Sequence, residues 1–286
     1  MRSFSLLALS LLPAGLLASE GAAHEGVSRK ASDLFTLGGF PISNSILTTW
    51  IIAILIIVAV RLTVGTPKLV PSKGQGVVEG MAQGLRDALE PIVGKQMIGK
   101  TFPILCGFFV FILLMNWSGL LPGVGTIKYN HDGHWLDAIR PANSDLNTTL
   151  ALSVLSFVAW TYFVLRYAGF KVLIFDLFGN KADKKEIGLP MWILLSFIFL
   201  GVGGIEVVSI LFRLISLSFR LYGNVFGGEN LIHSLGGIAP YVIPAVAGLL
   251  EVLVGLIQAF VFTLLSAVYI GLICNHEGGH DDEHAH

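Results

Sequence analysis

Charged side chains are scarce in this sequence. They make up 13% of its 286 residues, whereas 54% of the residues are hydrophobic and the formal net charge is −1. Soluble proteins carry about 25% charged residues, so this composition, with its mean hydropathy of +0.76, lies outside their range. Because there is no excess of positive charge, nothing indicates a nucleic-acid partner. We expect an integral membrane protein embedded in the lipid bilayer.

Motifs for soluble catalysis and for metal binding are missing as well. The sequence has no P-loop, no GxSxG motif and no zinc-type spacing of cysteine and histidine. Its two cysteines, Cys106 and Cys274, lie in apolar runs, where an inert buried thiol is expected. His131 and His134 lie in a polar loop, where solvation is expected rather than metal binding. We therefore predict no catalytic activity of the chain by itself, no cofactor and no metal.

The two ends of the chain differ from the rest. Residues 1–23 combine an early arginine, a short apolar stretch and small residues, which predicts a signal peptide cut after Ala23, with an uncleaved anchor as the alternative. Residues 24–45 would then form a periplasmic segment. The tail, residues 275–286, mixes histidine with acidic residues and is predicted to be a disordered cytoplasmic segment, with weak zinc or nickel binding as the alternative.

Long apolar stretches fill the part between these ends, residues 46–274, which we predict to be the membrane domain. Each stretch is long enough to cross a hydrocarbon core of about 30 Å. They occupy residues 42–62, 102–121, 146–167, 190–235 and 241–274. We predict an all-α membrane protein with about five transmembrane helices.

Residues 76–98 have a different pattern. Apolar residues recur there with helical period, and charged residues such as Glu79, Arg86, Asp87 and Glu90 stand between them. This pattern predicts an amphipathic helix that lies on the membrane surface rather than across it.

Lysine and arginine are distributed unevenly between the connecting segments. Residues 61–101 carry six and residues 166–190 carry five, against two in 24–46 and two in 122–144. Positive residues accumulate on the cytoplasmic side of membrane proteins. The predicted orientation therefore has the N-terminus in the periplasm and the C-terminus in the cytoplasm.

The last two apolar stretches are too long for upright helices. Residues 190–235 would extend roughly 69 Å and residues 241–274 roughly 51 Å as helices, at about 1.5 Å per residue. Glycine and proline in 236–240 predict a short turn between them. We expect a long, strongly tilted hairpin, and the rival is a split of the first arm at the glycines of 201–204.

Polar residues of the first arm follow helical spacing. Steps of three or four residues connect Glu206, Ser209, Arg213, Ser216, Arg220 and Asn224. Arg220 therefore lies on a polar face of the helix. Glu229 is about 180° around the helix from Arg220, with His233 one turn further, so Glu229 is expected to face a packed neighbour helix, unless Gly227 and Gly228 bend the chain.

The second arm contributes Glu251 and Gln258, which lie on one helical face. If Gln258 is level with Arg220, Glu251 and Glu229 lie roughly 10 to 13 Å toward the outside and share one aqueous pocket. Glu206 then lies roughly 21 Å from Arg220 toward the cytoplasm. Arg220 would stand between two polar paths that approach from opposite sides and do not align.

A charge at the centre of a bilayer costs at least about 2.5 to 3.5 kcal/mol and is functional by default. A guanidinium stays protonated, so Arg220 cannot relay a proton itself. It can attract a carboxylate, repel a moving proton or bind an anionic substrate. The alternative is a buried ion pair with Glu206 or Glu229 that locks two helices together.

The segment SLSFRLYGNVFGGENLI, residues 216–232, resembles the signature region of the a subunits of F-type ATP synthases. NWSGLLPG at 116–123, ANSDLNTTLALS at 142–153 and EVLVGLIQAFVFTLLSAVYI at 251–270 resemble the same family. The resemblance covers roughly residues 45–274. It implies a stator subunit that translocates protons through two offset half-channels, beside a ring of c subunits, b subunits of the peripheral stalk and the rest of the F1F0 complex in the bacterial inner membrane.

The resemblance also implies roles for individual residues. Arg220 matches the essential arginine, and Asn224 and Gln258 match polar residues near it. The outer half-channel would contain Glu229 and Glu251, the inner one Glu206 and Ser216, and Asp145 matches a polar position at the outer end of its helix. His233 joins the outer path or bonds within its helix, and some family members have histidine in place of Glu251.

A secondary transporter that clamps an anionic substrate with Arg220 is the alternative function, and a purely structural anchor is a third. Transporters usually show repeated halves with broken helices in both. Here the intramembrane charge is confined to one terminal hairpin, which argues against a transporter.

Overall fold

The computed structural model describes residues 33–66, 68, 70–121, 124, 128–131, 134–137, 139–178, 189–236 and 242–274. The predicted signal peptide, most of the periplasmic segment and the histidine-containing tail lie outside these residues. In chain order the described elements are β1 (Asp33–Leu37), β2 (Phe40–Ser43), α1 (Asn44–Val64), α2 (Lys73–Val93), α3 (Lys95–Trp117), β3 (Lys128–His131), β4 (His134–Asp137), α4 (Leu146–Phe163), α5 (Phe170–Phe178), α7 (Leu189–Gly236) and α8 (Val242–Cys274). Single turns, η2 (Ser118–Leu120) and η3 (Ala142–Ser144), flank the connection between α3 and α4, and a wider turn, η4 (Val164–Ala168), extends α4.

Helices dominate the fold, as the hydropathy pattern predicts. The segments long and apolar enough to cross a membrane are Asn44–Val64, Lys95–Leu120, Leu146–Ala168, Leu194–Ile232 and Pro244–Leu272. They coincide with the five predicted stretches, so the prediction of an all-α membrane protein with about five spans is confirmed.

Two small β-hairpins, which the sequence pattern did not predict, lie in the connections. β1 pairs with β2 through Gly38 and Gly39, whose φ angles of 59° and 91° suit a tight hairpin turn. β3 pairs with β4 in the connection between α3 and α4. Both are only a few residues long, too short for the alternation of apolar and polar residues to be distinguished from a loop.

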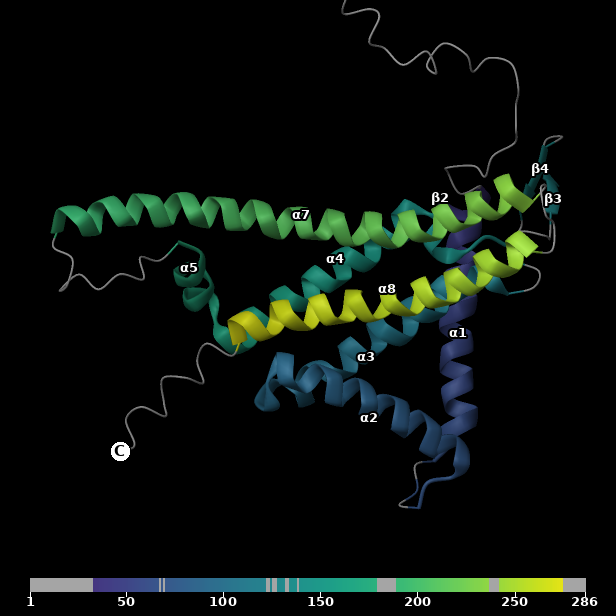
Figure 1. Cartoon of the computed structure of the whole chain (residues 1–286), viewed down its shortest axis with the longest axis horizontal. Coiled ribbons are helices and arrows are strands. Elements are labelled where there is room, and N and C mark those ends of the chain that lie inside the picture. Colours follow the sequence, from purple (N-terminus) through teal and green to yellow (C-terminus); the bar gives the residue numbers. More distant parts are fainter. Residues whose placement is uncertain are drawn as a thin grey trace, which may run out of the picture.

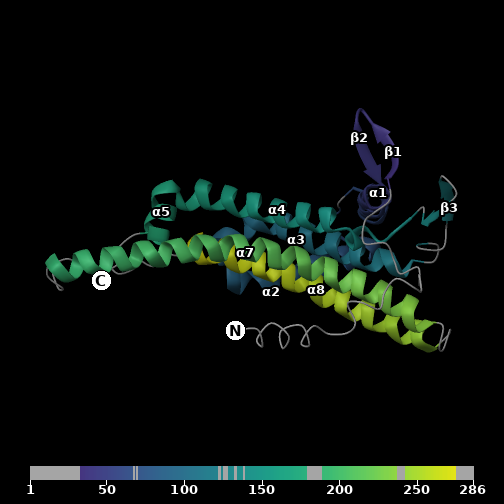
Figure 2. The ribbon, with the colours of Figure 1, turned by 90° about the horizontal axis from the view of Figure 1, so that it is seen from above.

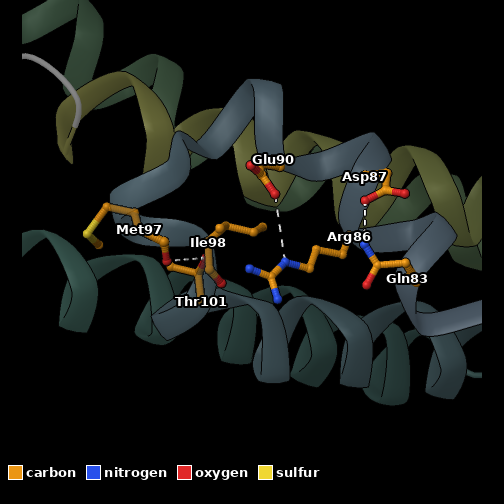
Figure 3. A network of polar contacts seen from close by, with 7 residues as sticks. All are labelled: Gln83, Arg86, Asp87, Glu90, Met97, Ile98 and Thr101. Atoms are coloured by element: carbon orange, nitrogen blue, oxygen red, sulfur yellow. Dashed lines mark hydrogen bonds and ion pairs between the residues drawn. The ribbon is translucent and has the colours of Figure 1, made fainter. Parts of the chain in front are cut away.

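The amphipathic helix α2 begins and ends earlier than predicted. It runs from Lys73 to Val93, because Gly94 adopts a φ of 89° and starts a new helix, α3, which contains the last residues of the predicted range. Figure 3 shows its polar face, where Gln83 Nε2 donates to Asp87 and Arg86 pairs with Glu90 at 3.7 Å. Its opposite stripe, including Leu89, is buried against α3 and α8.

The first arm of the hairpin is one unbroken helix. α7 is helical throughout Leu189–Gly236, including residues 201–204, so the rival split of this segment is wrong. Its 48 residues extend about 72 Å. Figures 1 and 2 show α8 running antiparallel beside it.

The orientation of α1 indicates how steeply this hairpin is tilted. α1 has 21 residues and is about 32 Å long, just enough to cross a hydrocarbon core upright. In Figure 1 it lies across the direction of α7 and α8, and Figure 2 views it nearly end-on. A hairpin that lies across an upright span must be strongly inclined to the membrane normal.

Packing joins these helices into one bundle. α3 lies against α8 and α4 lies against α7, with Ile112, Met115, Leu221 and Phe262 fully buried between them. The far end of α8 is held close to α2, since a Cβ atom at Gly271 would overlap the carbonyl oxygen of Ile92. We call the end of the bundle where α7 ends and α8 begins the hairpin end.

Candidate functional site

Arg220 lies on the exposed face of α7. Its neighbours Phe219 and Ser216 are exposed with it, whereas Leu217 is buried beside this face and Ser218 is buried on the opposite face. Ser218 shares a hydrogen bond of 3.1 Å with Thr149 of α4, which fixes the rotation of α7 about its axis. The part of the predicted polar face that carries Ser216 and Arg220 is therefore exposed, whereas Arg213 and Asn224 of the same face contact α8.

Neither of the carboxylates considered as a partner pairs with Arg220. Glu206 forms an ion pair of 3.4 Å with Arg213, and Glu229 forms one of 3.5 Å with Arg140. In the part of the chain that the structure describes, Arg220 has no hydrogen bond or ion pair. The described residues therefore contain no ion pair between Arg220 and either carboxylate that would lock two helices together.

Asn224 connects the two arms of the hairpin. Its Nδ2 donates a hydrogen bond of 3.1 Å to Oε1 of Gln258 on α8. Gln258 is only 5% exposed, and its buried Nε2 has no hydrogen-bond partner among the described residues. This bond places Gln258 of α8 level with Asn224 of α7, which is one helical turn from Arg220.

A cavity of about 130 Å³ opens beside this bond, toward the hairpin end. It is large enough for several water molecules. Its polar lining consists of Asn116, Asn224, Glu251 and Gln258, and Gly228 lies on its α7 wall. A Cβ atom at Gly228 would lie 3.3 Å from the carboxylate of Glu251, so glycine makes room for this side chain.

The two carboxylates near the hairpin end have different partners. Glu251 lines the cavity and has no hydrogen bond or ion pair within the described ranges. Glu229 is close enough to interact with it electrostatically, as the spacing predicts, but Glu229 is not part of the cavity lining. It turns toward the neighbouring segment, where Arg140 lies.

That segment, residues 140–145, is buried, and the sequence analysis gave a role to its Asp145 but not to Arg140. Asn143 donates to Asn116 at 2.7 Å, and the amide of Ala142 donates to Ser118 at 3.3 Å, which ties the segment to the end of α3. Asn116 in turn donates to the carbonyl oxygen of Gly255 on α8. Arg140 is 4% exposed although it belongs to a loop, and only its contacts identify it.

Asp145 also belongs to this buried segment. It caps α4, because its side chain accepts a hydrogen bond of 3.1 Å from the amide of Asn147. Its other oxygen accepts a bond of 2.9 Å from Ser45 of α1. These contacts give Asp145 a structural role at the predicted end of its helix.

Glu206 lies on the other side of Arg220. The fourteen residues between them correspond to about 21 Å along α7. Arg213, which pairs with Glu206, also lies over the ring of Tyr269 of α8, at 3.9 Å from the ring centre. Ser216 is exposed between Glu206 and Arg220 along α7. His233 is part of α7, but its side chain lies outside what the structure describes.

Metal binding has no support in the described residues. No group of three or more histidine, cysteine, aspartate or glutamate side chains gathers there. The arrangement is instead suited to holding a fixed positive charge between two separate polar regions.

These features define a multi-pass helical membrane protein with an exposed arginine on a long tilted hairpin and an acidic cavity to one side. Residues 46–271 match the family described as ATP synthase A chain. The ATP synthase subunit a of Moorella thermoacetica is 32% identical over 239 residues, which cover 83% of this chain and 94% of that protein. The chain belongs to this family of membrane subunits of ATP synthase.

Proposed function

We propose that the protein is the stator subunit that translocates protons in an F-type ATP synthase. The main support for this proposal is Arg220, a fixed cation on the exposed face of α7 without a partner in the described part of the chain. Burying such a charge in lipid costs at least about 2.5 to 3.5 kcal/mol. A negatively charged group on another subunit would compensate for this cost.

The surroundings of Arg220 support a protein partner. Phe212, Ile215 and Phe219 are exposed on the same region of α7. Apolar side chains around a single charge suit a face that packs against helices while offering one ion-pairing position. We identify the partner as the ring of c subunits, each of which would carry a carboxylate.

The mechanism follows from the cost of charge in a membrane. A rotor carboxylate must be neutral to pass through lipid, and it is ionised opposite Arg220 because a fixed cation favours the charged form. A proton would enter by one half-channel, travel with the ring and leave by the other. Each charge that crosses the membrane potential releases about 2.3 kcal/mol per 100 mV, which biases the rotation.

The two half-channels lie on opposite sides of Arg220. We assign the outer one to the cavity with Asn224, Glu251 and Gln258, and His233 extends it toward the hairpin end. The inner one contains Ser216 and Glu206. Since a guanidinium keeps its proton, Arg220 also blocks direct transfer between the half-channels.

The subunit has no catalytic site of its own in this proposal. It acts in the bacterial inner membrane with the c ring, the b subunits of the peripheral stalk and the soluble ATPase head. Its N-terminus is periplasmic and its C-terminus cytoplasmic, in agreement with the distribution of lysine and arginine.

Purification in mild detergent tests this function. The chain should co-purify with a ring of small two-helix proteolipids and an ATPase head, and vesicles containing the complex should acidify on addition of ATP. Isolation of the chain without these partners would contradict the proposal and favour a transporter or an anchor.

A further inference from the structure

We propose that the two carboxylates near the hairpin end have separate roles, with Glu229 as the fixed counter-ion of Arg140 and Glu251 as the group that takes up and releases the proton. The inference rests on the proposed function, because it assigns roles within the outer half-channel. It makes Arg140 a positioning residue that no sequence motif identified.

Arg140 is held in place by its surroundings. Its side chain is 4% exposed, and the five residues that follow it are all buried. Hydrogen bonds attach this segment to α3 through Ala142 and Asn143, and to α1 through Asp145. The segment that carries Arg140 is therefore fixed by contacts with several helices.

Glu229 balances the charge of Arg140. The two groups are 3.5 Å apart, and Glu229 is only 16% exposed. A guanidinium does not release its proton. Protonating Glu229 would thus remove the carboxylate charge that lies 3.5 Å from this buried cation, which is unfavourable. Glu229 is consequently unsuited to cycling between its charged and neutral forms during each transfer.

Glu251 has the opposite environment. Its carboxylate lies in the cavity, close to Gly228 and Gly119, with no hydrogen bond or ion pair in the described parts of the chain. The polar groups that line the cavity with it, Asn116, Asn224 and Gln258, are neutral amides. Nothing there opposes a neutral carboxyl group, so Glu251 can accept a proton from outer water and pass it to the rotor carboxylate.

Among the described residues, Glu229 is the charged group that acts directly on Glu251, and Arg140 acts through Glu229. Glu229 on α7 interacts with it electrostatically, and Arg140 on the buried segment neutralises Glu229. Asp145, on the same segment, is bonded to Ser45 and Asn147. Arg140 therefore limits how strongly Glu229 repels the ionised form of Glu251.

Replacing the charged residues by glutamine, one at a time and as a pair, distinguishes the role of Glu229 from that of Glu251 in the assembled complex. ATP-driven acidification and passive proton conductance are measured in vesicles containing wild type, Glu251→Gln, Glu229→Gln, Arg140→Gln and the double variant Arg140→Gln/Glu229→Gln. We expect Glu251→Gln to lower the rate about 100-fold or more, the usual contribution of a positioned proton-transfer group. Each single change at the ion pair should also impair transport, because it removes one charge of a buried ion pair and keeps the other.

The double variant gives the decisive result. Two glutamines can occupy the place of the ion pair and bond to each other, so most of the wild-type rate should return. A double variant as inactive as Glu229→Gln alone would overturn the inference, as would a Glu251→Gln complex that transports normally. A double variant that fails to incorporate into the complex, measured by immunoblot, would also count against it.

Proton transport by the wild-type complex shows whether the proposed function or only the assignment of the two carboxylates has failed. If the wild-type complex moves no protons, the proposed function fails. If wild type transports protons and only the pattern among the variants differs, the function stands and the assignment of the two carboxylates is wrong.

Discussion

Asn224 on α7 and Gln258 on α8 are joined by a hydrogen bond of 3.1 Å that sets the register of the hairpin. Arg220 lies one turn from Asn224 in one direction, and Glu251 lies two turns from Gln258 in the other. At about 1.5 Å per residue, the fixed cation and the cavity carboxylate are separated by roughly 16 Å along the hairpin. A proton on Glu251 therefore needs a carrier to pass the level of Arg220.

Replacing Arg220 tests whether this cation drives the coupling. Arg220→Ala should abolish ATP-driven proton pumping and raise the passive proton leak, because the barrier between the half-channels is lost. Arg220→Lys should fail as well, since lysine releases its proton more readily in a desolvated site and lacks the planar fork. Quenching of a pH-sensitive dye in membrane vesicles measures both effects.

Arg61→Ala provides the control for general effects of charge removal. Arg61 is exposed in the last turn of α1, where its loss should cost only about 0.3 to 1 kcal/mol of helix stability. Vesicles with this variant should pump at the wild-type rate. An Arg220→Ala complex that pumps as well as Arg61→Ala would contradict the proposed function.

Hydropathy and helical phase predicted much of this arrangement. The five spans are set by length and apolarity, which are local properties of the sequence. The position of Glu229 opposite Arg220 followed from 100° per residue, but the buried neighbour that the structure places there is a loop segment rather than a helix.

The sequence pattern could not identify Arg140 as the neighbour of Glu229. Arg140 reads as an ordinary loop cation, and its burial depends on how the chain between α3 and α4 folds back onto α1, α3 and α7. The spacing of apolar and polar residues along the sequence does not indicate such contacts between distant segments. The end of α2 at Gly94 was missed for a similar reason, since apolar spacing continues into α3.

A pair of cysteines tests which face of α7 is buried. Thr149 and Ser218 share a hydrogen bond of 3.1 Å, so Thr149→Cys combined with Ser218→Cys should form a disulfide on mild oxidation. Cys106 and Cys274 are first replaced by serine to avoid other pairings. Mass spectrometry of digested, unreduced protein detects the cross-linked peptides.

Ser216 supplies the matched control for this pair. It lies two residues from Ser218 but on the exposed face of α7. Thr149→Cys combined with Ser216→Cys should give no internal disulfide. Equal cross-linking of both pairs would show that the rotation of α7, and with it the outward direction of Arg220, is incorrect.

Close packing of α8 against α2 makes Gly271 sensitive to substitution. In Gly271→Ala the added methyl group would overlap the carbonyl oxygen of Ile92, so we expect a loss of about 1 to 3 kcal/mol from overpacking. Gly107→Ala on α3 meets no atom within 4 Å and should leave stability unchanged or slightly raised. The melting temperature measured by thermal unfolding in detergent should therefore be lowered only for Gly271→Ala. Equal melting temperatures for the two variants would contradict this packing.

Asp145 allows a capping role to be separated from a role in proton transfer. Asp145→Ala removes the acceptor for the amide of Asn147 and for Ser45, and should lower stability by about 1 to 2 kcal/mol. Asp145→Asn keeps an oxygen that accepts the capping bond but cannot carry a proton as a carboxylate does. We expect this variant to melt near wild type and to transport protons at the wild-type rate per assembled complex. Loss of transport in Asp145→Asn without loss of stability would instead place Asp145 in the outer half-channel.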